Sequence, residues 1–231
     1  MFRSKWTTNN IQDQSGRVVV ITGANSGIGF EAARILAYNN AKVILAIRDT
    51  AKGEQARQQI IAGHPGAKVL VEQLDLACLA SIRNFANKIT SSHKRLDLLI
   101  NNAGVMIPPL SRTAEGFEMQ FGVNHLGHFA LTALLFDLVA STIDSRIVTV
   151  SSLAHRQGKL DFNDLNWESR RYRRSQAYAD SKLANLYFTA ELARRLEDGD
   201  YLTIATAAHP GYTATNLQQN MPMHGLLNAF L

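Results

Sequence analysis

The chain has 231 residues, of which 46% are hydrophobic and 19% are charged, and it carries one cysteine. This length and composition predict one globular α/β unit and exclude a disordered, collagen-like or repeat protein. The single cysteine excludes an internal disulfide and a metal cluster built on cysteines. Part of the formal net charge of +5 lies in one run of arginines, which we interpret as a solvated loop and not as a nucleic-acid surface. The run consists of Arg170, Arg171, Arg173 and Arg174.

The N-terminal segment 1–15 is polar and lacks the apolar core of a secretory signal. The longest apolar stretch, residues 129–140, contains Thr132 and Asp137 and is shorter than the ~20 residues that a membrane span needs. We therefore expect a cytoplasmic protein with no membrane span and no nucleic-acid partner.

Short apolar runs alternate with helical patterns along the chain. The predicted strands are 17–22, 41–48, 67–74, 96–101, 145–152 and 202–208, and each has the continuous apolar character of a strand buried on both faces. The predicted helices are 27–39, 50–62, 78–92, 114–141 and 176–197. Connections of this length force parallel, right-handed crossovers. The pattern therefore predicts an α/β fold with a single doubly wound parallel sheet, Rossmann-like, and helices on both faces.

Ligands bind such sheets beyond the carboxyl ends of the strands. The first of these ends carries the sequence Thr-Gly-Ala-Asn-Ser-Gly-Ile-Gly at 22–29, directly before the first predicted helix. Glycines let the backbone approach a pyrophosphate closely, and the helix N-terminus offers unpaired N–H groups. Glycines at this spacing are also typical of an ordinary tight turn, but their place between strand and helix favours a dinucleotide site. The candidate cofactor-binding residues of this turn are Gly23, Asn25, Ser26, Gly27, Ile28 and Gly29.

The end of the second predicted strand distinguishes NADP from NAD. An acidic residue there binds the ribose 2′-hydroxyl of NAD, whereas a basic residue accommodates the 2′-phosphate of NADP. The apolar Ile47 stands where we would expect the carboxylate, and Arg48 follows it. This favours NADP (NADPH) over NAD. In the alternative, Arg48 pairs with Asp49 at the surface and Asp49 turns towards the ribose.

Tyr178 and Lys182 lie four residues apart in a predicted helix and therefore share one face. A lysine ammonium beside a phenol favours the phenolate, so we expect Lys182 to lower the pKa of Tyr178. Such a tyrosine can exchange a proton with a carbonyl oxygen beside a hydride donor. Taken singly, a tyrosine near a helix start is a packing residue and the Ser151–Ser152 pair is a turn. Together with the glycine turn they indicate an active site.

These motifs together resemble the short-chain dehydrogenase/reductase family, and within it the branch similar to retinol dehydrogenases and the WW-domain oxidoreductase. The resemblance covers residues 16 to about 217. Its motifs are the Thr-Gly-x3-Gly-x-Gly turn, Asp75, the Asn-Asn-Ala-Gly sequence at 101–104, Ser152 with Tyr178-x3-Lys182, and Pro210-Gly211 with Thr215. The stretch 178–182 is also similar to light-dependent protochlorophyllide reductases, which the segment 210–212 and the single cysteine fit less well.

The resemblance implies roles for individual residues. Asn124, Ser152, Tyr178 and Lys182 match the catalytic positions of the family, with Tyr178 as general acid and base and Lys182 also binding the nicotinamide ribose. In the family, an asparagine at the place of Asn124 bends its helix, and a backbone carbonyl there holds a water that reaches the lysine. The implied cofactor contacts are Asp75 and Leu76 at the adenine, Asn102, Ala103 and Gly104 along the cofactor, and Pro210, Gly211, Thr213 and Thr215 at the nicotinamide end. For the histidines near these motifs, among them His128, we expect structural roles, and we expect no metal site.

Two features depart from the family pattern. Ser152 and Tyr178 are 26 residues apart, which is a long gap, and the intervening segment contains Phe162, Trp167 and Tyr172. A long segment beside an active site commonly shapes the substrate entrance, and its aromatic residues favour an apolar substrate, although its arginines could attract an acidic one. After Asn216 only fifteen residues remain, so we expect the seventh strand of the family to be missing. The predicted organisation is an N-terminal extension at 1–15, an NADP-binding and catalytic domain at 16–217 and an incomplete substrate-covering segment at 218–231.

Two functions follow from these observations. The first is an NADP-dependent oxidoreductase that reduces a carbonyl or oxidises an alcohol of a lipophilic small molecule. The second is a scaffold or sensor that binds NADP(H) with little turnover, which the incomplete C-terminal segment favours. The predicted helices 114–141 and 176–197 carry apolar residues on more than one face, and this stripe is either a homodimer interface or a core face.

Overall fold

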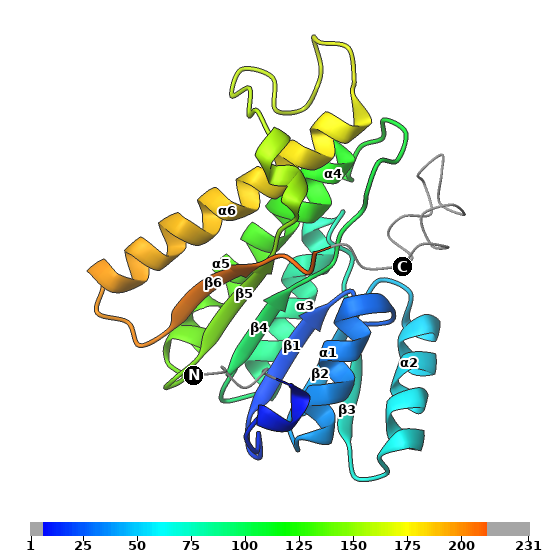
Figure 1. Ribbon diagram of the computed structural model, residues 1–231, viewed down its shortest axis with the longest axis vertical. Helices are drawn as coiled ribbons and strands as arrows, with labels where there is room; N and C mark the ends of the chain where they lie inside the picture. Colours follow the sequence, from blue (N-terminus) through cyan, green and yellow to red (C-terminus); the bar gives the residue numbers. More distant parts are fainter. Residues whose placement is uncertain (1–6, 212–231) are drawn as a thin grey trace, which may run out of the picture.

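The computed structural model describes residues 7–211, and its centre is one six-stranded parallel sheet (Figure 1). The strands are β1 (Val18–Thr22), β2 (Lys42–Ile47), β3 (Lys68–Gln73), β4 (Leu98–Asn101), β5 (Arg146–Val150) and β6 (Ile204–Ala208). Their order across the sheet is β3-β2-β1-β4-β5-β6, and every neighbouring pair is parallel. The order reverses between β1 and β4, which is where a doubly wound sheet opens a crevice for a ligand. The predicted fold class and the six strands are confirmed.

Helices cover both faces of the sheet (Figure 1). The long helices are α1 (Gly27–Tyr38), α2 (Thr50–Gly63), α3 (Leu79–Ser92), α5 (Gly127–Ala140) and α6 (Arg174–Asp198). Shorter helical segments are η1 (Thr8–Asn10), α4 (Met119–Phe121), η2 (Gly122–Leu126) and η3 (Leu153–Gln157). Small residues such as Ala33 and Ala37 let α1 lie close to the sheet, and Asp49 caps α2 by accepting the backbone N–H groups of Ala51 and Lys52.

The core has two halves because neighbouring residues of a strand point to opposite faces. Val19 and Ile21 of β1 pack with α1 and α2, whereas Val20 packs with the half that contains α3 and α5. The expectation that all strands are buried on both faces is wrong for the outer two. β3 exposes half of its residues and β6 exposes most of them, and each has a strand neighbour on one side only among the described residues.

The predicted helix 114–141 is wrong at its start and is divided. Residues 114–118 are not helical, since Arg112 and Glu118 form an isolated antiparallel bridge that turns the chain back. The helix begins at Met119, where the Glu118 carboxylate caps the first N–H groups, and Gly122–Leu126 has π-helical hydrogen bonding. A π segment within a helix often marks a functional site. Here it contains Asn124.

By length and composition alone, the helical run Met119–Ala140 is apolar enough to cross a membrane. Its apolar residues Leu131, Leu135 and Val139 are fully buried in the protein core, and 39% of the most apolar window of this run is buried. Leu134 of the same run and Tyr187 of α6 remain exposed. The homodimer stays a prediction.

Candidate functional site

The glycine turn follows β1 and leads into α1, as predicted. Gly23 has a φ of +66°, and a Cβ there would lie 2.9 Å from the Cα of Ala103. A Cβ on Gly29 would lie 2.4 Å from the side-chain amide of Asn102, which donates a 2.7 Å hydrogen bond to the carbonyl of Thr22. These two glycines are therefore required for the packing of the turn against the segment after β4. The two motifs form one unit at the crevice.

The N-terminus of α1 is open to a ligand on its own side of this unit. Ser26 is the N-cap residue, yet its side chain makes no capping hydrogen bond, and Gly27 has a φ of +56°. The first N–H groups of the helix are thus left to bind an anion, which the helix dipole favours. Asn25, Ser26 and Ile28 are half-buried around them.

Thr22 and the buried His128 connect the turn to the neighbouring motifs. The Thr22 hydroxyl accepts the backbone N–H groups of Asn102 and Ala103, each at 2.9 Å. It also lies 2.9 Å from Nε2 of His128, whose Nδ1 lies 3.0 Å from the backbone carbonyl of Asn124. A carbonyl can only accept, so Nδ1 carries the proton and Nε2 accepts from Thr22. Burial lowers the pKa of His128 to about 3, which keeps this ring neutral.

Asn124 is completely buried in the π-helical segment. Its side chain exchanges two hydrogen bonds with the backbone of Val105, at 2.8 Å and 3.0 Å, and donates to the Ser181 hydroxyl at 3.0 Å. Its backbone carbonyl faces His128, as described above. The family resemblance implies that a backbone carbonyl in this segment holds a water. In this structure the backbone carbonyl of Asn124 is hydrogen-bonded to the His128 ring.

Tyr178 and Lys182 lie side by side on α6, which is the predicted arrangement. The Lys182 ammonium is 5.7 Å from the centre of the Tyr178 ring, and the two residues are 3% and 7% exposed. The Lys182 Nζ donates to the carbonyl of Val150 at the end of β5, at 3.1 Å. Burial lowers the pKa of Lys182 to about 8. This ammonium therefore remains charged at neutral pH.

The expected lowering of the Tyr178 pKa is wrong for this structure. Burial raises the pKa of the Tyr178 phenol, and a hydrogen bond with the Ser152 side chain opposes that rise. Removing the phenolate from water disfavours it more than the hydrogen bond with Ser152 favours it, so the protonated phenol is the stable form.

The structure distinguishes between the two adjacent serines. Ser151 is buried, and its hydroxyl donates to the backbone carbonyl of Lys182 at 2.8 Å. Ser152 is only half-buried and its hydroxyl interacts with Tyr178 and accepts the N–H of Ala154 at 3.2 Å. Ser152 is therefore the serine that faces the Tyr178 phenol, and Ser151 holds α6 against the end of β5.

At the end of β2, Ile47 is buried and Arg48 is exposed. Asp49 caps α2 and pairs with Lys52 at 3.9 Å, so the carboxylate is engaged by its own helix. This geometry does not support the alternative in which Asp49 pairs with Arg48.

The remaining predicted cofactor residues lie at the same edge of the sheet. Asp75 is half-buried after β3 and accepts the N–H of Ala77 at 2.9 Å, while Leu76 is buried in the core. A Cβ on Gly104 would lie 3.7 Å from the Lys182 Nζ. Pro210 and Gly211 are exposed after β6. Thr213 and Thr215 lie outside the described residues.

Residues 17–224 match the family described as short chain dehydrogenase. The chain belongs to the short-chain dehydrogenase family. It is 50% identical over 210 residues to human retinol dehydrogenase 13 and 50% identical over 213 residues to mouse retinol dehydrogenase 12. These alignments cover 91% and 92% of this chain, but the chain spans only 63% and 66% of the two relatives.

Solved structures show the same short-chain dehydrogenase fold. An uncharacterized protein from Mycobacterium paratuberculosis has a TM-score of 0.83 at 47% identity, over 98% of this chain and 80% of that chain. A short chain dehydrogenase from Escherichia coli, solved with NADPH, has a TM-score of 0.74 at 26% identity, over 92% of this chain and 84% of that chain.

Two features of this short-chain dehydrogenase escaped the sequence reasoning. His128 was predicted to be structural, but no pattern indicated that its ring lies between the Thr22 hydroxyl, 106 residues earlier in the chain, and the backbone carbonyl of Asn124. The interpretation of the arginine run as a solvated loop holds for Arg171 and Arg173; Arg174 is exposed but begins α6, and Arg170 is not solvated. The Arg170 guanidinium stacks 3.6 Å from the ring centre of Trp167 and faces two carboxylates. Within residues 7–211, no group of three or more His, Cys, Asp or Glu side chains is arranged to hold a metal ion.

Proposed function

We propose that this chain is an NADP(H)-dependent oxidoreductase that reduces a carbonyl, or oxidises an alcohol, of a lipophilic small molecule. The observation that carries the proposal is the buried Tyr178, which has Lys182 beside its ring and Ser152 at its hydroxyl, at the carboxyl edge of the sheet. The glycine turn lies at the same edge.

The residues of this edge fit a nicotinamide dinucleotide. The uncapped N-terminus of α1 offers N–H groups to a pyrophosphate. Arg48 is exposed at the end of β2, where it would meet a 2′-phosphate, and Asp49 is held away by its cap. Among the described residues, the Lys182 Nζ has one hydrogen-bond acceptor, Val150, so further N–H donors remain for a ribose hydroxyl. The NADPH complex of the Escherichia coli relative supports the same choice of cofactor.

When bound, the cofactor supplies or takes up the hydride at the substrate carbon. Tyr178 gives its proton to the carbonyl oxygen, and its raised pKa keeps that proton in place at neutral pH. Ser152 donates a hydrogen bond to the oxygen on which charge develops. Lys182, charged below about pH 8, stabilises the phenolate that is left behind. Asn124 holds the Val105 segment and Ser181 in place around these groups.

The lipophilic class of substrate rests on two observations. The curated relatives named above are retinol dehydrogenases by name. The segment between Ser152 and Tyr178 carries Phe162, which is exposed, as well as Trp167 and Tyr172, whose rings contact each other.

The first test is Tyr178→Phe, which removes only the phenol oxygen. We expect kcat for NADPH oxidation with an apolar aldehyde or ketone to fall by about 10²–10⁴-fold, because the proton donor is lost. The NADPH Kd, measured by fluorescence titration, should change little. Tyr187→Phe is the matched control, since Tyr187 is an exposed tyrosine on the same helix. Retained turnover in Tyr178→Phe would remove the proposed mechanism, and tight NADPH binding without turnover of any carbonyl in the wild type would favour the scaffold function.

A second test addresses the cofactor. Arg48→Gln should weaken NADPH binding and leave NADH binding nearly unchanged, because only NADPH carries the 2′-phosphate. Arg156→Gln is a matched control, since Arg156 is also exposed and lies after β5. Equal losses for both cofactors would contradict the assignment of Arg48.

A further inference from the structure

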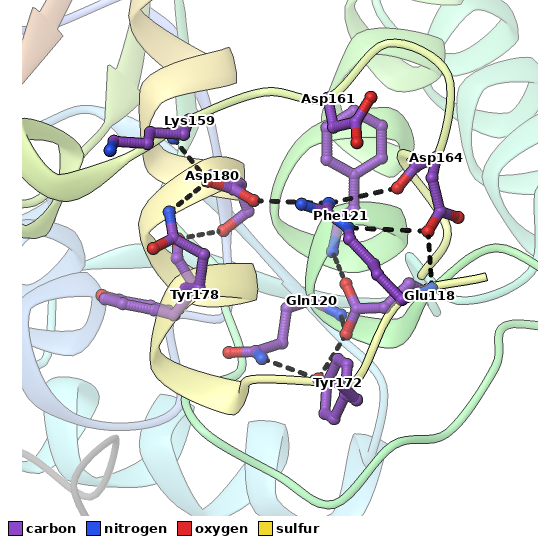
Figure 2. Close-up of polar contacts among 12 residues, drawn as sticks. Glu118, Gln120, Phe121, Lys159, Asp161, Asp164, Tyr172, Tyr178 and Asp180 are labelled. Carbon is purple, nitrogen blue, oxygen red and sulfur yellow. Dashed lines mark hydrogen bonds and ion pairs between the residues drawn. The ribbon is translucent and has the colours of Figure 1, made fainter. Parts of the chain in front are cut away.

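Residues 158–173, which we term the insert, connect η3 to α6 and so lie between Ser152 and Tyr178 in the chain. The insert follows η3, which begins directly after Ser152, and ends at the start of α6, whose fifth residue is Tyr178. Figure 2 shows the insert beside the first turns of α6, with Tyr178 projecting from the helix on the side away from Asp164 and Glu118. Any shift of the insert therefore acts on the turn that carries the proposed proton donor.

The middle of the insert is organised around Asp164. The Asp164 carboxylate accepts the backbone N–H groups of Glu168 at 2.6 Å, Ser169 at 3.3 Å and Arg170 at 3.2 Å. The Glu168 N–H contributes most to lowering the pKa of Asp164, so this carboxylate is charged at neutral pH. These bonds fold the chain back so that Arg170 reaches over Trp167.

Arg170 then connects this loop to α6. Its guanidinium stacks on the buried Trp167 ring and lies 3.6 Å from the Asp164 carboxylate and 3.8 Å from Asp180. Asp180 is 3% exposed, and its Oδ2 has no hydrogen-bond partner among the described residues. Its Oδ1 accepts the N–H of Lys159 at 2.7 Å and the Gln176 side chain at 2.8 Å. Within the described structure, Arg170 is thus the one cation in an ion pair with this buried carboxylate.

The end of the insert has a separate attachment to α4. The Tyr172 hydroxyl donates to the buried Glu118 carboxylate at 2.7 Å and accepts from Gln120 at 2.9 Å. Asn166 bonds the backbone N–H of Glu118 at 3.1 Å and accepts from Arg112 at 2.8 Å. The insert is therefore held at two places, α6 and the start of the π-containing helix, which carry Tyr178 and Asn124.

We propose that the Asp164–Arg170–Asp180 cluster holds the insert as a fixed wall of the substrate site, and that Arg170 is a positioning residue for the first turns of α6. The proposal rests on the proposed function for the identity of the site, but the contacts of the cluster are independent of it. A loop that is fixed in this way binds substrate without first losing conformational freedom. Arg170 does not contact the cofactor turn, so its loss should affect the substrate and leave cofactor binding unchanged.

The test compares Arg170→Gln with Arg171→Gln in the 231-residue chain. Arg171 is the matched control because it is the next residue, has the same charge and is exposed. We expect Arg170→Gln to lower kcat/KM for an apolar carbonyl on the order of 10–100-fold, mainly through KM, because misplacement of about 1 Å has such an effect. The NADPH Kd should stay within about twofold of wild type. Arg171→Gln should match the wild type in both.

A second measurement does not depend on turnover. The chain has two tryptophans, so Trp6→Phe leaves Trp167 as the single reporter. In that background we expect Arg170→Gln to shift the Trp167 emission to longer wavelength and to accelerate tryptic cleavage within the insert, because the ring loses its cover. Arg171→Gln should do neither. These two measurements remain informative if the wild type turns over no carbonyl. Failure of the proposed function can therefore be distinguished from failure of the role proposed for Arg170.

A third variant tests the charge balance. In Arg170→Gln the Asp180 carboxylate is buried without a cation. The double variant Arg170→Gln with Asp180→Asn removes that charge and keeps an acceptor for the backbone N–H of Lys159. We expect the double variant to recover part of the emission and KM of the wild type. If Arg170→Gln does not fold, Arg170→Lys replaces it, with a smaller change expected because the charge remains and the planar stack is lost. Identical behaviour of the Arg170 and Arg171 variants, or no recovery in the double variant, would overturn the proposal.

Discussion

His128→Gln should remove a pH dependence of stability that one buried imidazole creates. The pKa of His128 falls from 6.5 to about 3 in the folded protein, mainly through burial, and the nearby Lys182 and His125 act in the same direction. The unfolded chain therefore binds one more proton than the folded chain between these two values, so the contribution of His128 to stability is complete above pH 6.5 and is lost as the pH falls below it. At about 1.4 kcal/mol per pH unit, lowering the pH from 7.5 to 5.0 should cost about 2 kcal/mol from this group alone.

Glutamine can offer both a donor and an acceptor but does not titrate. At pH 7.5 we expect His128→Gln to be about 1–3 kcal/mol less stable than the wild type, because the two buried hydrogen bonds to Thr22 and Asn124 are disturbed. As the pH falls to 5.0, the difference between the two proteins should shrink by about 2 kcal/mol.

The assay is urea unfolding followed by circular dichroism at several pH values from 7.5 to 5.0. Other groups titrate in this range, but they are common to both proteins and cancel in the difference. The exposed His209 provides the control, since His209→Gln removes an imidazole outside the core. Parallel stability curves for the wild type and His128→Gln would refute the reasoning, because they would mean that the ring gains its proton as readily in the folded state as in the unfolded chain.

Three further predictions follow from the site. Ser152→Ala should lower kcat about 10²–10³-fold, because its hydroxyl would bond the substrate oxygen. Ser151→Ala should mainly cost about 1 kcal/mol of stability, because its hydrogen bond to the Lys182 carbonyl is lost. Steady-state kinetics and thermal melts separate the two effects, and equal losses of kcat would contradict the assignment. Gly29→Ala should destabilise the protein by about 1–3 kcal/mol in the same melts, because the new Cβ would lie 2.4 Å from the Asn102 amide; an unchanged melting temperature would contradict this. Lys182→Met should be more stable than the wild type at pH 7. The pKa of Lys182 in the folded protein, about 8, lies below the reference value of 10.5, so the wild type gains about 3 kcal/mol of stability as the pH rises between those values. The advantage of the variant should therefore vanish by about pH 10.5. A difference in stability that stays constant with pH in urea unfolding would count against a buried ammonium.

Several parts of the site could be predicted from local sequence. The strands were located within about two residues because a parallel strand is a short apolar run between turn residues, and that pattern is visible without any contact. The spacing of Tyr178 and Lys182 placed them on one helix face for the same reason, since the helical period is local. The start of the helix before Asn124 was mistaken because Glu118, which the pattern places inside the helix, pairs instead with Arg112, and such a pairing leaves no periodic signal in the sequence.

Other features depend on groups that are distant in the sequence. Arg170 was read as solvated because a run of arginines normally is, and nothing local shows that Asp180 is buried and that Trp167 lies beneath the guanidinium. The direction of the Tyr178 pKa was missed because spacing reveals a neighbouring charge but not the loss of water around the phenol.

The amino-acid sequence by itself determined the α/β class, the order of elements, the place of the glycine turn and the shared helix face of Tyr178 and Lys182, because each depends on residues within a few positions of one another. Only the tertiary structure decided which of the two serines meets the tyrosine, that His128 is neutral with its proton on Nδ1, and that the insert is attached through Arg170. These outcomes depend on burial and on hydrogen bonds between segments tens of residues apart, whose free energies arise only when the chain has excluded water from between them.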